Sequence, residues 1–216
     1  MATTTVHLLR HGEVHNPQGV LYGRLPGFHL SERGQAMAQR IAEHFTSLTP
    51  TPDLAAVIAS SLQRAQETAT PLAQAFGLQI QTDDRVIEAE NYFEGMTFGV
   101  GDGSLKHPRH WRKIYNPFKP SWGEPYKQQV ARVLGAVHDA RDANPGRESL
   151  IVSHQLPIWI TRLHLENKHL WHDPRKRQCS LASLTSLVFQ DTQLVDIRYS
   201  EPAADLLPGA SAVAGA

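Results

Sequence analysis

Three short apolar stretches along the chain predict buried β-strands. They run from Val6 to Leu9, from Ala55 to Ala59 and from Leu150 to Val152, and all are rich in β-branched or aliphatic residues. Each stretch stops abruptly at polar residues. Two later strands are predicted from Ala182 to Phe189 and from Val195 to Tyr199.

Between these strands, apolar residues recur at three- and four-residue spacing, which is the period of an amphipathic helix. Pro71 falls inside the second of these patterns and predicts a kink or a fresh start there. A third helix is predicted from Tyr126 to about Asn144, where Asn-Pro-Gly is a stop signal. The first two apolar faces consist of Leu30, Gly34, Met37, Ile41 and Phe45, and of Ala65, Ala69, Leu72 and Phe76.

The alternation of these elements predicts the fold class. Strands that are apolar on both faces need helices on both sides of the sheet, and such sheets are largely parallel. We therefore expect an α/β protein, a three-layer α/β/α sandwich with a mostly parallel central sheet. One domain is predicted over residues 1–199.

Two segments depart from this pattern. Residues 91–126 hold eight of the 16 aromatic residues together with several Lys and Arg residues, without sustained periodicity, and predict an excursion from the sheet. Residues 200–216 are rich in Ala, Gly, Pro and Ser, and predict a flexible C-terminal tail.

Composition narrows the class of function. The chain has 216 residues with 21 Lys and Arg against 21 Asp and Glu, and this balance disfavours a nucleic-acid-binding surface. No segment approaches the roughly 20 apolar residues that span a bilayer, and the single Cys179 cannot form an internal disulfide. We expect a cytoplasmic protein with a small-molecule partner and no membrane or nucleic-acid partner. The oligomeric state stays open, a homodimer included.

The residues that follow the three apolar stretches carry candidate chemistry. The carboxyl ends of parallel strands meet at one crevice, so side chains placed there converge. Guanidinium groups and a helix N-terminus bind tetrahedral oxyanions, and a neutral imidazole can attack phosphorus. A phosphate pocket with a nucleophile is therefore predicted from Arg10-His11-Gly12-Glu13, Ser60-Ser61-Leu62-Gln63-Arg64 and Ser153-His154-Gln155.

The order of these motifs resembles the histidine phosphatase superfamily, which contains the cofactor-dependent phosphoglycerate mutases and many phosphatases. The resemblance extends from about residue 5 to residue 190 and implies a phosphoglycerate mutase-like fold. It also implies that residues 91–126 are the variable insertion that shapes the substrate side. The residues that carry it are Arg10-His11-Gly12-Glu13, Ser60-Ser61-x-x-Arg64-Ala65-x-x-Thr68-Ala69, Arg85-Val86-Ile87-Glu88 with Glu94-Gly95, and Ser153-His154.

The resemblance also implies roles for individual residues. His11 would be the phosphorylated nucleophile, and Arg10, Arg64 and His154 would bind the phosphoryl group. Glu88 would act as general acid and base, with Glu13 and Glu90 as rivals for that role. No cofactor and no metal are required for this chemistry.

Four further residues are candidates for contacts with the phosphate or the substrate. Asn16 stands five residues after His11. In the family, the phosphate-binding Asn usually stands six residues after the nucleophile. Gln155 replaces the Gly that commonly follows the second His. Arg24 lies in a loop that can reach substrate, and Arg112 belongs to a segment that faintly resembles the basic segment of the mutases.

The spacing of some histidines is compatible with metal sites, and the alternative is that they are ordinary surface or loop histidines. His7, His11 and His15 are four residues apart, but a strand and a turn keep them from sharing a helix face. A second cluster, at residues 164, 169 and 172 (all His), is weighed against ordinary surface histidines. The run Arg175-Lys176-Arg177 is interpreted as a solvated basic patch.

Three functions remain in competition at this point. The first is a phosphatase that hydrolyses a small organic phosphomonoester through a phosphohistidine. The second is a phosphoglycerate mutase, which uses the same residues but returns the phosphate to a product. The third is a non-catalytic module that binds a phosphorylated ligand without turnover.

Overall fold

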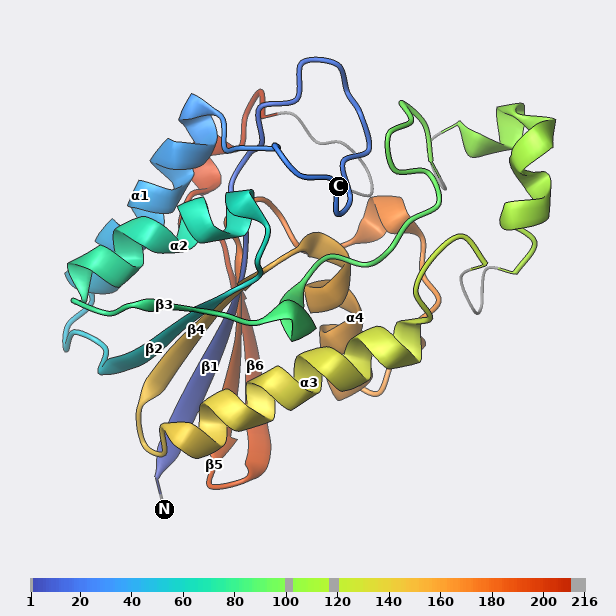
Figure 1. Cartoon of the computed structure of the whole chain (residues 1–216). Coiled ribbons are helices and arrows are strands. Elements are labelled where there is room, and N and C mark those ends of the chain that lie inside the picture. Colours follow the sequence, from blue (N-terminus) through green and yellow to red (C-terminus); the bar gives the residue numbers. More distant parts are fainter. Residues whose placement is uncertain (1, 100–102, 117–120, 211–216) are drawn as a thin grey trace.

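The computed structural model describes residues 2–99, 103–116 and 121–210. Its centre is a six-stranded sheet with the order β3-β2-β4-β1-β5-β6 (Figure 1). The strands are β1 (Thr3–Arg10), β2 (Leu54–Ala59), β3 (Ile80–Thr82), β4 (Glu148–Ser153), β5 (Leu184–Gln190) and β6 (Gln193–Ser200).

The sheet is mostly parallel. Strand β4 lies between β1 and β2 and is parallel to both, and β3 is parallel to β2. Strands β5 and β6 form an antiparallel hairpin on the other edge, beside β1. The carboxyl ends of β1, β2 and β4 therefore meet at one edge of the sheet.

Helices cover both faces of the sheet, as Figure 1 shows. Helices α1 (Glu32–Ser47) and α2 (Gln63–Ala75) pack on one face, and α3 (Tyr126–Ala143) and α4 (Gln155–Leu165) on the other. Alternate strand residues serve the two faces: Leu9 belongs to the core under α1 and α2, and Leu8 to the core under α3 and α4. The predicted three-layer α/β/α sandwich is confirmed.

Several local predictions differ from the structure. Helix α2 continues through Pro71, so no new helix starts there. Helix α4 and the short strand β3 were not predicted, and β5 begins two residues later than expected because Ala182 adopts a left-handed turn conformation with φ 51°.

The predicted flexible tail is wrong for residues 201–210. After β6 the chain forms the short 3₁₀ helix η5 (Ala204–Leu206), and Ala203 is buried in the core under α1 and α2. Leu206 and Leu207 pack against the same core, which offsets the entropy of ordering the segment. The rest of the predicted tail, residues 211–216, lies outside the described residues.

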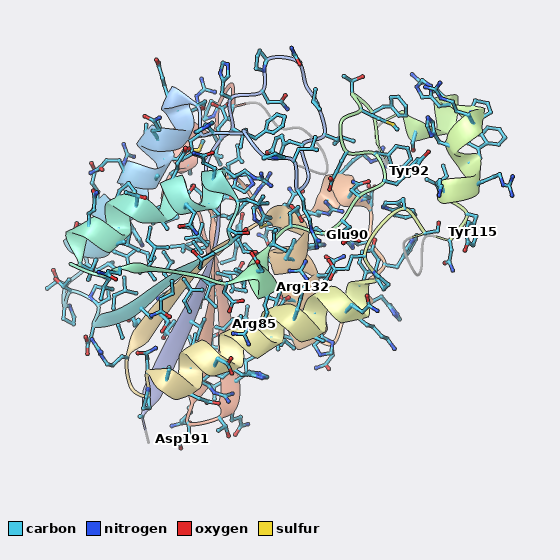
Figure 2. The ribbon with its side chains drawn as sticks, viewed as in Figure 1. Arg85, Glu90, Tyr92, Tyr115, Arg132 and Asp191 are labelled. Atoms are coloured by element: carbon cyan, nitrogen blue, oxygen red, sulfur yellow. The ribbon has the colours of Figure 1, made fainter. Side chains whose placement is uncertain are left out.

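The predicted insertion stands apart from the sheet. Its described parts form two 3₁₀ helices, η2 (Ser104–Lys106) and η3 (Pro108–Lys113). Figure 2 shows Tyr115 at the outer end of this segment and Tyr92 on the side that faces the rest of the molecule. Among the described residues, no helix is long and apolar enough to cross a membrane.

Candidate active site

His11 and His154 meet at the carboxyl end of the sheet. His11 follows the last residue of β1, and His154 follows the last residue of β4, the neighbouring parallel strand. Their ring centroids are 5.2 Å apart, and both side chains are fully buried. Strand pairing thus joins two motifs that are 143 residues apart in the sequence.

The hydrogen bonds of His11 define its tautomer. Nδ1 lies 2.8 Å from the carbonyl oxygen of Gly12, which only accepts, so Nδ1 carries the ring proton. Nε2 is buried and has no hydrogen-bond partner among the described residues. Burial lowers the pKa of His11 well below its ordinary value, and the charges of Arg64 and Arg10 lower it further. A neutral imidazole with a bare Nε2 is suited to nucleophilic attack.

Two glycines bring α1 against the turn that carries His11. A Cβ atom on Gly12 would lie 2.6 Å from the carbonyl oxygen of Gly34, and one on Gly34 would lie 2.0 Å from the carbonyl oxygen of Glu13. Such distances are closer than side-chain carbons come to backbone atoms. Glycine at both positions therefore allows α1 to pack directly on this turn.

His154 is held through Ser60, the residue that follows β2. Its Nε2 lies 2.8 Å from the hydroxyl oxygen of Ser60, which also accepts a hydrogen bond from the backbone N–H of Leu62. The Nδ1 atom of His154 is buried without a hydrogen-bond partner in the described parts of the chain. Burial lowers the pKa of His154 well below its ordinary value, and Arg64 contributes in the same direction.

Arg10 and Arg64 make the site cationic. Arg64 is in the first turn of α2, is almost completely buried, and donates through Nη2 to the carbonyl oxygen of Gly23 at 2.6 Å. Its guanidinium carbon lies 4.7 Å from the centroid of the Tyr22 ring. Arg10 is buried and donates through Nη1 to the carbonyl oxygen of Cys179 at 2.8 Å. Both charges lower the pKa of His11.

Glu88 is the buried carboxyl group of the site. It follows the 3₁₀ helix η1 (Asp84–Val86) and accepts a 2.8 Å hydrogen bond from the backbone N–H of Ala89. Burial raises its pKa, although the nearby guanidinium groups oppose that shift. Two other carboxylates were predicted as alternatives for the acid role. Glu13 accepts a hydrogen bond from the Ser31 hydroxyl at the start of α1, and Glu90 is largely exposed.

Arg24, which was predicted as a substrate contact, is paired with two carboxylates. Its Nη1 and Nη2 atoms pair with the carboxylates of Glu90 and Glu124 at 3.0 and 3.1 Å. Its Nε donates to the carbonyl oxygen of Glu88 at 2.7 Å. Arg132 on α3 also donates to Glu124, and to the carbonyl oxygens of residues 85 and 87. Figure 2 shows Arg132 and Glu90 in this region, where two arginines fix the backbone that carries Glu88.

Of the three other predicted contacts, one lines a cavity beside Glu88 and two do not. The amide of Asn16 exchanges two hydrogen bonds with the backbone of Val20, so it closes its own loop. The cavity beside Glu88 is lined mainly by residues 88–91 and 122–124 and by the first turns of α3 and α4. Arg112, which is exposed on η3, does not line it. Gln155 does line that cavity, and its Oε1 accepts a 3.1 Å hydrogen bond from Arg177.

Sequence reasoning missed Arg177 and Tyr22. Arg177 was assigned to a solvated patch, but it turns inward after the 3₁₀ helix η4 (Pro174–Lys176) and lines the same cavity as Glu88. Tyr22 is buried between Arg64 and His11, with its ring centroid 6.4 Å from that of His11. Neither residue lies in a recognisable motif, so only a search for buried polar residues near the strand ends could have found them.

The second histidine cluster does not form a metal site. His172 donates through Nδ1 to the carbonyl oxygen of Leu170 and accepts at Nε2 from Arg177, so both ring nitrogens are engaged. Within the described parts of the chain, no three His, Cys, Asp or Glu side chains gather where they could hold a metal ion.

Comparison with known sequences identifies relatives over most of the chain. The chain is 55% identical over 201 residues to the uncharacterized protein Rv0525 of Mycobacterium tuberculosis, which covers 93% of this chain and 98% of the relative. It is 31% identical over 157 residues to phosphoserine phosphatase 1 of Hydrogenobacter thermophilus, covering 70% and 71% of the two chains.

Comparison with solved structures identifies the same fold. The structure of mycobacterial glucosyl-3-phosphoglycerate phosphatase superposes with a TM-score of 0.70 at 23% identity, covering 91% of this chain and 97% of the other. The model of the histidine phosphatase superfamily (branch 1) matches residues 6–200, which include every strand-end motif described above. The chain therefore belongs to the histidine phosphatase superfamily, branch 1.

Proposed function

We propose that the protein is a phosphatase that hydrolyses a small organic phosphomonoester through a phosphohistidine at His11. The observation that carries this proposal is the Nε2 atom of His11, which is bare among the described residues while Nδ1 is fixed as a donor to Gly12. A nucleophile held in this way lies among two guanidinium groups and a buried carboxyl group. That combination supports phosphoryl transfer.

The reaction follows from these groups in two steps. Nε2 of His11 attacks phosphorus and the bond from phosphorus to the alkoxide oxygen breaks, while the Glu88 carboxyl group gives its proton to that oxygen. The Glu88 carboxylate then takes a proton from water, the water oxygen attacks phosphorus, and the bond from phosphorus to Nε2 breaks. Arg10 and Arg64 neutralise the phosphoryl oxygens in both steps.

His154 has a distinct part in this scheme. Since Ser60 accepts the N–H of Leu62, its hydroxyl is free to donate to Nε2 of His154. The ring proton of His154 then lies on Nδ1, where it donates to a phosphoryl oxygen. Ser60 in this way selects the tautomer that binds the phosphoryl group.

The decisive experiment compares p-nitrophenyl phosphate hydrolysis by the wild type, His11→Ala and His15→Ala. His15 is exposed and four residues along the chain, so it is the matched control. We expect His11→Ala to abolish both turnover and an acid-labile phosphoprotein, and His15→Ala to retain them. A wild type that binds phosphate but neither turns over nor becomes phosphorylated would identify a binding module instead.

We favour hydrolysis over mutase action, which would use the same residues. The basic segment expected to hold a phosphoglycerate includes Arg112, which is exposed on η3 and does not line the cavity at Glu88. A coupled assay with 2,3-bisphosphoglycerate tests this preference. Stimulated interconversion of 2- and 3-phosphoglycerate would overturn it.

A further inference from the structure

The segment that stands apart from the sheet carries an unbalanced positive charge. Residues 103–116, which include η2 and η3, hold four of the 21 Lys and Arg residues of the chain and no Asp or Glu. All 21 acidic residues therefore lie outside this segment, and the rest of the chain is acidic. The balanced total charge conceals a local excess of cations, which are Lys106, Arg109, Arg112 and Lys113.

These four cations have no carboxylate partners in the described parts of the chain. All four side chains are exposed, and no ion pair joins any of them to an Asp or Glu there. Exposed arginines elsewhere are paired, as Arg147 is with Asp53 at 2.6 Å and Arg175 with Asp173 at 2.9 Å. The four like charges lie within residues 106–113 and repel one another, so an anion from outside stabilises them.

A cluster of aromatic rings holds the inner side of this segment. The ring of Phe98 stacks on that of His107 with a centroid distance of 3.9 Å. His110 is buried, and its ring centroid lies 5.7 Å from that of Phe93. Its Nδ1 lies 3.2 Å from the hydroxyl oxygen of Tyr92. Because the buried rings occupy the inner side, the exposed cations lie on the outer side.

Two exposed aromatic side chains lie beside the cations. Trp111 is 53% exposed and Tyr115 is 77% exposed, and Figure 2 shows Tyr115 at the outer end of the segment. Trp111 directly precedes Arg112 on η3. Trp and Tyr rings have an apolar body and a polar tip, and they are enriched at the level of the lipid headgroups. The outer surface therefore combines cations with rings that suit a membrane interface.

We propose that residues 106–115 form a docking surface for a membrane that contains anionic phospholipids. Clusters of roughly four to eight Lys or Arg residues bind such surfaces, and each basic residue strengthens the binding by about fivefold. The rings of Trp111 and Tyr115 enter the headgroup region. Such a contact needs no spanning helix. It replaces the sequence-based expectation of no membrane partner, which considered spanning segments alone.

The placement of the cations favours a lipid surface over a nucleic acid. The segment projects from the body of the molecule, as Figure 1 shows, so it meets a flat surface without bringing the acidic remainder of the chain into contact. A nucleic-acid strand is instead held in a basic groove that follows its backbone over several nucleotides. The four cations lie on the outer side of a projecting segment, which is the arrangement that a flat anionic surface requires.

The test measures co-sedimentation of the protein with vesicles of phosphatidylcholine, alone or with about 30% phosphatidylglycerol. The wild type is compared with Lys106→Gln/Arg112→Gln. Neither of these side chains has a hydrogen bond or ion pair among the described residues, so the fold should be retained, as circular dichroism checks. The matched control is Lys127→Gln/Lys176→Gln, which removes the same charge from exposed positions outside the segment.

We expect the wild type to bind the anionic vesicles, to leave them at high salt and not to bind phosphatidylcholine alone. Lys106→Gln/Arg112→Gln weakens binding by about 25-fold, and the control changes it by less than about threefold. Brominated lipids should quench tryptophan fluorescence in the wild type. Most of that quenching should be lost in Trp111→Phe, which places this ring at the membrane.

A wild type that does not bind the anionic vesicles overturns the proposal. So does an equal loss in the two double variants, because that result reports net charge alone. Tighter binding to a single-stranded oligonucleotide or to polyglutamate than to the vesicles also overturns it. If Lys106→Gln/Arg112→Gln unfolds, the quenching comparison decides, and equal quenching of the wild type and Trp111→Phe contradicts the proposal. None of these measurements depends on phosphatase activity.

Discussion

The imidazole rings of His11 and His154 lie 5.2 Å apart, and each has one ring nitrogen without a partner among the described residues. The other nitrogen of each ring is held, by the carbonyl oxygen of Gly12 in one case and by Ser60 in the other. The Gly12 carbonyl oxygen therefore orients the imidazole of His11, and the Ser60 hydroxyl orients that of His154.

Replacing Ser60 by Ala removes the group that orients His154. We expect Ser60→Ala to lower kcat for p-nitrophenyl phosphate by about 10-fold, which corresponds to one hydrogen bond of roughly 1.4 kcal/mol. Ser61 is exposed and adjacent, so Ser61→Ala is the matched control and should leave kcat unchanged. Equal kcat values for the two variants would show that Ser60 does not orient His154.

Removing Arg24 loosens the backbone that carries Glu88. Arg24→Ala loses a 2.7 Å hydrogen bond to the Glu88 carbonyl oxygen and two ion pairs. We expect kcat to fall about 10-fold for an alkyl phosphate, whose leaving group needs a proton, and by less than about threefold for p-nitrophenyl phosphate. Arg40→Ala, which removes an exposed ion pair with Asp205, is the control. Equal losses for both substrates would indicate general unfolding of the site.

The pH dependence of hydrolysis follows from opposite pKa shifts. Burial raises the pKa of Glu88, so the proton donor persists above the ordinary range of a carboxyl group, and burial lowers the pKa of His11, so the nucleophile stays neutral below its ordinary range. We expect an acidic optimum for alkyl phosphates, with kcat falling as Glu88 loses its proton. In Glu88→Gln that basic limb disappears and alkyl phosphate turnover drops at least 100-fold, as measured by pH-rate profiles. A basic limb retained in this variant would assign the acid role elsewhere.

Stability should decrease with acidification because of the buried histidines. The pKa of His172 is about 4 in the folded chain, below its ordinary value near 6.5, so the unfolded chain binds the proton first. Its contribution is present above about pH 6.5 and is lost as the pH falls toward 4. After allowance for partial exposure, we expect His172→Gln to reduce the loss between pH 7 and pH 5 by about 1 kcal/mol in urea unfolding. The exposed His169→Gln control should behave as wild type, and an identical loss in both variants would contradict the assignment.

Local patterns along the chain were enough to predict the layer architecture and the principal strands. Strands such as Leu150 to Val152 are apolar on both faces, and that pattern requires a covered sheet whatever the rest of the chain does. It also predicted that His11, Arg64 and His154 converge, because each directly follows a strand or begins the next helix. Each of these motifs can be recognised locally, and the pairing of β1, β2 and β4 brings them to the same edge of the sheet.

The surroundings of Arg24, Arg177 and the segment after β6 could not be predicted without the fold. An arginine has the same sequence signature whether it pairs with Glu124, faces a cavity or lies in solvent, because its partners come from distant parts of the chain. The Ala- and Pro-rich segment from residue 201 reads as a tail, but the core under α1 and α2 has room for Ala203 and its neighbours. Packing between distant segments carries no local pattern, so these three assignments required the fold.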